Sequence, residues 1–110
     1  MNANELRIGN YLLGYDNNYF TWDYGHYDLC SKGIDADELG MPIELTEEIL
    51  LKCGFKEIRK GVFKLKDWYI DLTSKVWKFK REYQDINFKH LHQLQNLYFA
   101  LTGKELEIEL

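Results

Sequence analysis

The chain has 110 residues, of which 45% are hydrophobic, enough to bury the core of one ordinary domain. One proline and eight glycines exclude a collagen-like or low-complexity chain. No apolar run approaches the roughly 20 residues that span a bilayer, and the first residues lack the apolar core of a secretory signal. We therefore expect a cytoplasmic protein with no membrane contact.

Charge is unevenly placed along the chain, whose net charge is −4. Residues 1–55 hold 3 basic and 10 acidic side chains, whereas residues 56–110 hold 11 basic and 8 acidic ones. Such asymmetry can steer a partner or promote head-to-tail association at low salt. Cys30 and Cys53 are too few for a disulfide framework, so we interpret both as free thiols.

The first third of the chain predicts two strands and a loop. Residues 6–13 are expected to form a strand, and a turn follows at residues 16–18. Residues 19–30 are rich in aromatics, which favour a second strand. Residues 31–41, rich in Gly and Asp, predict a loop. On the second strand, period 2 gathers on one face Trp22, Tyr24, His26, Asp28 and Cys30.

A short helix is predicted over residues 46–53. Thr46 suits the N-cap position, and Gly54 suits the left-handed residue after the helix. Phe55 is placed to fold back on Leu50, as apolar residues do in this termination motif.

An antiparallel meander is predicted over residues 55–81, with turns at residues 60–61, 66–67 and 73–75. Its apolar face holds Phe63, Leu65, Trp68, Ile70, Leu72, Trp77 and Phe79. The opposite face holds Lys64, Lys66, Tyr69, Asp71, Lys78 and Lys80. A longer helix is expected over residues 88–102, capped by Asn87 and ended by Gly103, and residues 105–110 predict a last short strand. The chain is thus expected to form one α+β domain over residues 1–110, with a partly open SH3-like barrel as the alternative to a flat meander.

Catalytic and metal-binding patterns are weak. His26, Asp28 and Cys30 would share a strand face, but no fourth ligand is identifiable. His90 and His92 are two apart on a helix and point in different directions. Because Gly-x-Ser-x-Gly and Gly-rich phosphate motifs are missing, we expect neither an enzyme nor a bound cofactor or metal.

Residues 90–102 carry no formal charge, which is unusual for an exposed helix. Amides are cheaper to bury than charges, so this pattern indicates a covered face. The cover is either the rest of the domain or a partner protein, including a second copy in a homodimer. The leading functional hypothesis is a protein-interaction module whose contacts are His92, Gln93, Gln95, Asn96 and Phe99.

The alternative hypothesis is nucleic-acid binding by the basic face of the meander. Lysines around an aromatic ring suit a phosphate backbone, although a solvated sheet face has the same composition. The residues concerned are Lys64, Lys66, Tyr69, Lys78 and Lys80.

The sequence HQLQNLYFALTGKEL at residues 92–106 resembles the C-terminal signature of small uncharacterised proteins common in anaerobic gut bacteria and their phages. Residues 6–11 and 43–55 resemble the same family. The resemblance implies an accessory protein of a phage or mobile element, and it implies no particular chemistry.

Overall fold

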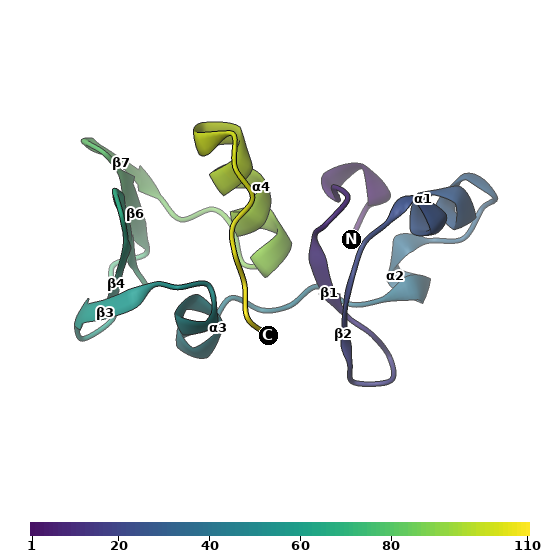
Figure 1. Ribbon diagram of the computed structural model, residues 1–110, viewed down its shortest axis with the longest axis horizontal. Coiled ribbons are helices and arrows are strands. Elements are labelled where there is room, and N and C mark those ends of the chain that lie inside the picture. The colour runs from purple at the N-terminus through teal and green to yellow at the C-terminus, as the bar shows by residue number, and fades with distance from the viewer. The chain divides into compact units, whose positions relative to one another are not determined.

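Helices and antiparallel sheets are both present in the computed structural model, which describes residues 1–110 and confirms the α+β prediction (Figure 1). Contacts divide the chain into two compact units. Unit 1 comprises residues 1–44 and 90–106, and unit 2 comprises residues 45–89 and 107–110. Unit 1 holds 3 basic and 9 acidic side chains, whereas unit 2 holds 11 basic and 9 acidic ones. The net negative charge of the protein therefore comes from unit 1.

Unit 1 is built from short elements around the side chains of Leu6, Leu12, Trp22 and Ala36. A hairpin pairs its two strands in antiparallel register. The predicted first strand is reduced to three residues, and the predicted loop at residues 31–41 contains a helical turn. The elements are η1 (Ala3–Glu5), β1 (Tyr11–Leu13), β2 (Tyr19–Thr21), α1 (Tyr24–Ser31), α2 (Ala36–Leu39) and α4 (Leu91–Thr102).

The prediction of a strand through residues 19–30 is wrong beyond Thr21, because helix α1 begins at Tyr24. Asp23 caps this helix: its carboxylate accepts from the His26 amide at 3.2 Å, and His26 Nδ1 accepts from the Asp23 amide at 3.0 Å. This reciprocal cap satisfies donors that a helix start leaves unpaired, and it outweighs the strand propensity of the aromatics. The strand face that would have grouped His26 with Cys30 therefore does not exist.

Helix α4 ends as predicted and begins later than predicted. Gly103 ends it with φ +73°. His90, not Asn87, is the residue before its first turn, and the His90 amide donates to Gln93 Oε1 at 3.0 Å. No helix of the structure combines the length and hydropathy needed to cross a membrane.

Unit 2 opens with α3 (Glu47–Lys52), and both of its predicted ends are confirmed. Thr46 Oγ1 accepts from the Ile49 amide at 3.3 Å. Gly54 has φ +88°, and the Phe55 amide donates to the Leu50 carbonyl at 3.1 Å.

A five-stranded antiparallel meander follows in the order β3–β4–β5–β6–β7, and the sheet is open at both edges. Its inward face is apolar as predicted, with Phe63, Trp68 and Ile70 buried. The fifth strand was not predicted, whereas the strand predicted at residues 105–110 is absent, and that prediction is wrong. The strands are β3 (Lys56–Arg59), β4 (Val62–Leu65), β5 (Trp68–Asp71), β6 (Val76–Phe79) and β7 (Glu82–Asp85).

Candidate functional site

The outward face of the meander carries a row of basic and aromatic side chains that crosses all five strands. Strand register pairs each residue of this row with the next, from β3 to β7. We call it the Lys–Tyr row; its members are Lys56, Lys64, Tyr69, Lys78 and Tyr83. Three of the residues proposed from the sequence, Lys64, Tyr69 and Lys78, are thus neighbours.

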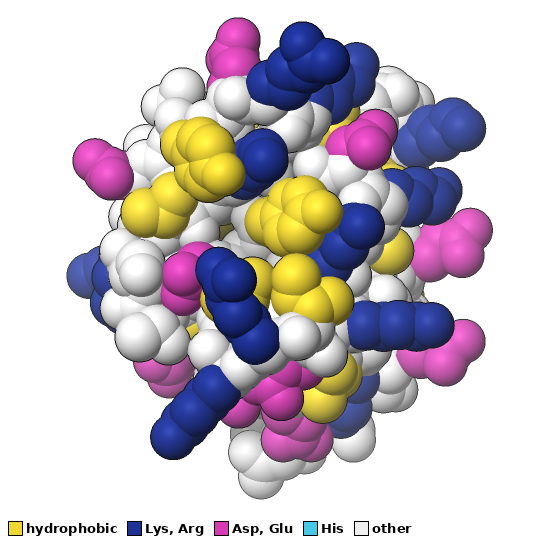
Figure 2. Space-filling view, turned by 90° about the vertical axis from the view of Figure 1, so that its left-hand side faces the viewer, with side chains coloured by type: hydrophobic (Ala, Val, Ile, Leu, Met, Phe, Trp, Pro, Cys, Tyr) yellow, Lys and Arg dark blue, Asp and Glu magenta, His cyan; other side chains and the backbone are white.

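Lysines of this row lie over the tyrosine rings. The ammonium groups of Lys64 and Lys78 are 5.3 and 5.4 Å from the centre of the Tyr69 ring, and Lys78 is also 4.9 Å from the centre of Tyr83. Cation–π contacts at exposed sites contribute about 0.5–1 kcal/mol each. They hold positive charge above aromatic surface, of which Tyr83 exposes 66%. Figure 2 shows this face, with aromatic rings among Lys and Arg side chains.

A second row runs parallel to the first and carries both charges. Register aligns Arg59, Val62, Asp71, Val76 and Asp85. The Asp71 carboxylate accepts from the amides of Thr73 and Ser74, both at 3.0 Å. These hydrogen bonds, helped by the charge of Arg59, lower the pKa of Asp71, so it is an anion at neutral pH.

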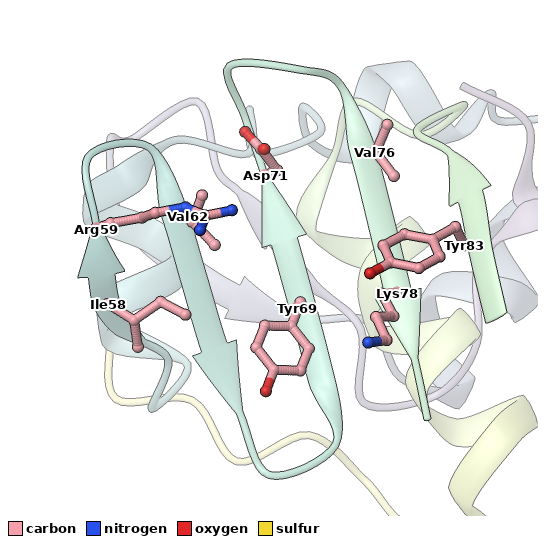
Figure 3. A pocket seen from close by; sticks show the side chains of 8 residues that line it. All are labelled: Ile58, Arg59, Val62, Tyr69, Asp71, Val76, Lys78 and Tyr83. Atoms are coloured by element: carbon pink, nitrogen blue, oxygen red, sulfur yellow. The ribbon is translucent and has the colours of Figure 1, made fainter. Parts of the chain in front are cut away.

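Between the two rows the sheet surface is hollowed. The hollow has a volume of about 280 Å³ (Figure 3). The apolar side chains that line it include Val62, which is buried, and Ile58, which is 51% exposed. The lining consists of Ile58, Arg59, Val62, Tyr69, Asp71, Val76, Lys78 and Tyr83. Aromatic, apolar and charged groups of both signs therefore meet in one place.

Lys66 and Lys80, the other two residues proposed for this face, lie in hairpin turns at one end of the sheet. Both have positive φ, +52° and +59°, and the Lys80 amide donates to the Asp67 carbonyl at 3.0 Å. They add charge at the rim rather than on the strands.

Three residues of this face were not predicted from the sequence: Lys56, Arg59 and Tyr83. Recognising residues 80–81 as a turn would have revealed β7 and its outward Tyr83.

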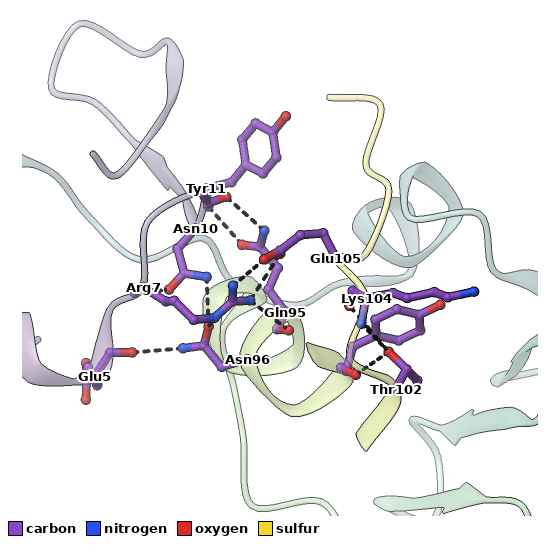
Figure 4. A network of polar contacts seen from close by, with 11 residues as sticks. Glu5, Arg7, Asn10, Tyr11, Gln95, Asn96, Thr102, Lys104 and Glu105 are labelled. Carbon is purple, nitrogen blue, oxygen red and sulfur yellow. Dashed lines mark hydrogen bonds and ion pairs between the residues drawn. The ribbon is translucent and has the colours of Figure 1, made fainter. Parts of the chain in front are cut away.

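The uncharged helix α4 uses its amides within unit 1 (Figure 4). Gln95 is buried; its Oε1 accepts from the Tyr11 amide at 2.8 Å and its Nε2 donates to the Gly9 carbonyl at 3.2 Å. Asn96 accepts from Asn10 Nδ2 at 2.9 Å and donates to the Glu5 carbonyl at 2.9 Å. The cover that the missing charge indicated is therefore supplied, for these two amides, by the chain's own N-terminal segment.

Arg7 completes this network. Its guanidinium pairs with Glu105, its Nε donates to Asn96 Oδ1 at 3.2 Å, and it lies 4.1 Å from the centre of the Phe99 ring. Phe99 keeps 39% of its surface exposed. Association through residues 90–102 stays a prediction, but the side-chain amides of Gln95 and Asn96 already form hydrogen bonds within unit 1.

His92, the remaining buried candidate, lies within unit 1 with no hydrogen-bond partner for either ring nitrogen. Its Nε2 is 3.6 Å from Glu5 Oε1, and its ring stacks on that of His90 at 5.7 Å. The prediction that these two side chains point in different directions is wrong, because His90 has an extended backbone and precedes the first helical turn. Burial lowers the pKa of His92, and the nearby His90 and N-terminal ammonium act in the same direction, whereas Glu5 opposes them.

We expect His92 to make stability depend on pH. In the unfolded chain it binds a proton near pH 6.5, whereas in the folded protein it does so only at lower pH. Acid therefore favours unfolding: the free energy of unfolding falls as the pH drops below about 6.5. His92→Leu, which fills the site without a titratable group, should reduce that slope in urea unfolding between pH 7.5 and 5. An identical slope in both proteins would contradict this.

Metal ligands, cysteine thiols and a second hollow are the other features that could carry chemistry or binding. No three His, Cys, Asp or Glu side chains are grouped as metal ligands. Burial raises the pKa of Cys53 to about 12, so its thiol is not a nucleophile at neutral pH. A second hollow, in unit 1, is lined by aromatics together with Asp16 and Asp23 but by no Lys or Arg, which does not suit a phosphate backbone.

No protein-family model, curated protein or solved structure matches the chain. The resemblance of residues 92–106 to the phage-associated family therefore stays a prediction.

Proposed function

We propose that the protein binds single-stranded nucleic acid on the outward face of its β3–β7 sheet. The observation that carries the proposal is the Lys–Tyr row, in which three lysines and two tyrosines are neighbours on one surface. Proteins that bind single strands without strong sequence preference combine aromatic platforms with a basic path for the backbone. Both components are present here at neighbouring positions.

Stacking of a base on Tyr69 has to displace the ammonium groups of Lys64 and Lys78 from the ring. The displaced contacts are worth about 0.5–1 kcal/mol each, whereas stacking a base contributes about 1–3 kcal/mol. A displaced lysine ammonium also gains a contact with a phosphate group of the strand. The exchange therefore favours the bound strand, and the lysines remain close enough to contact the backbone beside the stacked base.

A single strand suits this surface better than a duplex. The sheet face offers neither a helix nor a protruding ribbon that could enter a major groove, while its exposed rings need unstacked bases. The acidic balance of unit 1, 3 basic against 9 acidic side chains, opposes non-specific attraction. Binding should therefore depend on the row itself and weaken steeply with salt, by a log–log slope of about −2 for three phosphate contacts.

The test is fluorescence anisotropy with a labelled 12-nucleotide dT strand at low salt. Lys64→Glu combined with Lys78→Glu should lower affinity at least tenfold, because two contacts become repulsive. Lys32→Glu with Lys104→Glu makes the same change of charge in unit 1 and should lower affinity no more than about threefold, through long-range charge alone. No binding by the unaltered protein, or equal losses in both double variants, would overturn the proposal.

A further inference from the structure

Two side chains of opposite charge line the hollow beside the Lys–Tyr row, and they do not form an ion pair with each other. Arg59 and Asp71 both line it, and Figure 3 shows the Arg59 side chain extending from β3 across β4 toward the strand that carries Asp71. The rings of Tyr69 and Tyr83 line the same hollow, beside buried Val62. A flat ligand with a polar edge fits such a lining, since its faces meet rings and methyl groups and its edge meets Arg59 and Asp71.

We infer that this hollow takes a guanine base of the bound strand. Guanine presents two adjacent donors, N1–H and the 2-amino group, next to two adjacent acceptors, O6 and N7. A carboxylate accepts from the first pair, and a guanidinium donates to the second, which is the commonest specific arginine–base contact. The inference rests on the proposed function, because the base is delivered by a strand held on the Lys–Tyr row.

Asp71 is suited to this role because its carboxylate is positioned in advance. The two backbone amides at residues 73 and 74 both donate to Oδ1, and the Ser74 side chain also hydrogen-bonds the carboxylate, so the Asp71 side chain is held in place before a ligand binds. The other bases match less well. Adenine and cytosine offer one amino group to the carboxylate, and thymine presents one ring N–H between two carbonyl oxygens that the carboxylate repels.

The experiment compares 12-nucleotide dT strands that carry a single central dG, dA, dC or deoxyinosine, with the full chain and the anisotropy assay. The dG strand should bind about tenfold more tightly than the all-dT strand. Deoxyinosine lacks only the 2-amino group and should recover part of that gain.

Two variants assign the preference to the hollow. Asp71→Asn places an amide where the carboxylate accepts, and Arg59→Lys keeps the charge but loses the planar fork. Each should cut the dG preference, the ratio of affinity for the dG strand to affinity for the all-dT strand, to threefold or less. Asp71→Asn should also raise affinity for both strands, because it removes a negative charge from the binding face, and the ratio cancels that effect. Binding of the all-dT strand with no dG preference, or a preference that both variants retain, overturns this inference and leaves the proposed function standing. No binding of any strand overturns both.

Discussion

Replacing Asn96 by alanine is expected to lower the free energy of unfolding by about 2–4 kcal/mol. The amide of Asn96 joins helix α4 to three points of the N-terminal segment: it accepts from Arg7 and Asn10 and donates to the Glu5 carbonyl. Asn10 is fully buried, so the loss leaves its Nδ2 without a partner away from water. An unsatisfied buried donor costs about 1–3 kcal/mol, and the charged bond to Arg7 adds to the loss.

Urea unfolding followed by circular dichroism measures this effect. The matched control is Ala100→Gln, at an exposed position of the same helix, which should change stability by no more than about 0.5 kcal/mol. Equal, small effects of both substitutions would show that the network contributes little. A large effect also means that Asn96→Lys cannot test association through this helix cleanly, because the substitution perturbs the fold itself.

Local signals explain why parts of the fold were predictable. Helix α3 is specified within ten residues, from Thr46 to Phe55, and its cap, its left-handed glycine and its returning phenylalanine all lie where the sequence placed them. The meander was predictable because side chains alternate between faces with period 2 and turns separate the runs. Three residues of the Lys–Tyr row followed from that alternation alone.

Non-local and competing effects explain the failures. The strand propensity of residues 19–30 lost to the reciprocal cap between Asp23 and His26, a pairing in which histidine replaces the usual glutamate or glutamine. The missing charge of α4 showed that the helix is covered, but the covering residues lie more than 80 positions earlier in the chain. No sequence spacing identifies such a partner.

Replacing Ile70 by alanine is expected to destabilise unit 2 by about 2–5 kcal/mol, the usual cost of deleting a fully buried isoleucine side chain. Ile70 lies in the central strand, opposite Phe63 and Trp77, so the cavity opens between three strands. Ile70→Val, which removes one methylene, is the matched control at about 0.5–1.5 kcal/mol. Urea unfolding measures both, and an alanine variant no less stable than the valine variant would contradict the expectation.

Asn96→Ala destabilises unit 1, and Ile70→Ala destabilises unit 2. Because the chain connects the two units differently, the two variants should have different effects on the other unit, and this tests the prediction of a single domain. Unit 1 consists of residues 1–44 and 90–106, so unfolding unit 2 leaves an unfolded loop of 45 residues between its two segments. Closing such a loop costs roughly 3 kcal/mol by the (3/2)RT ln n relation, a large share of the stability of a small domain. Residues 45–89 of unit 2, by contrast, are continuous.

Hydrogen exchange measured by mass spectrometry on peptides from each unit distinguishes the outcomes. We expect Ile70→Ala to speed exchange in both units, because unit 1 loses its short connection when unit 2 opens. Asn96→Ala should speed exchange in unit 1 more than in residues 45–89. Equal effects of Asn96→Ala in both units would indicate one cooperative domain, whereas Ile70→Ala effects confined to unit 2 would show two units that unfold independently.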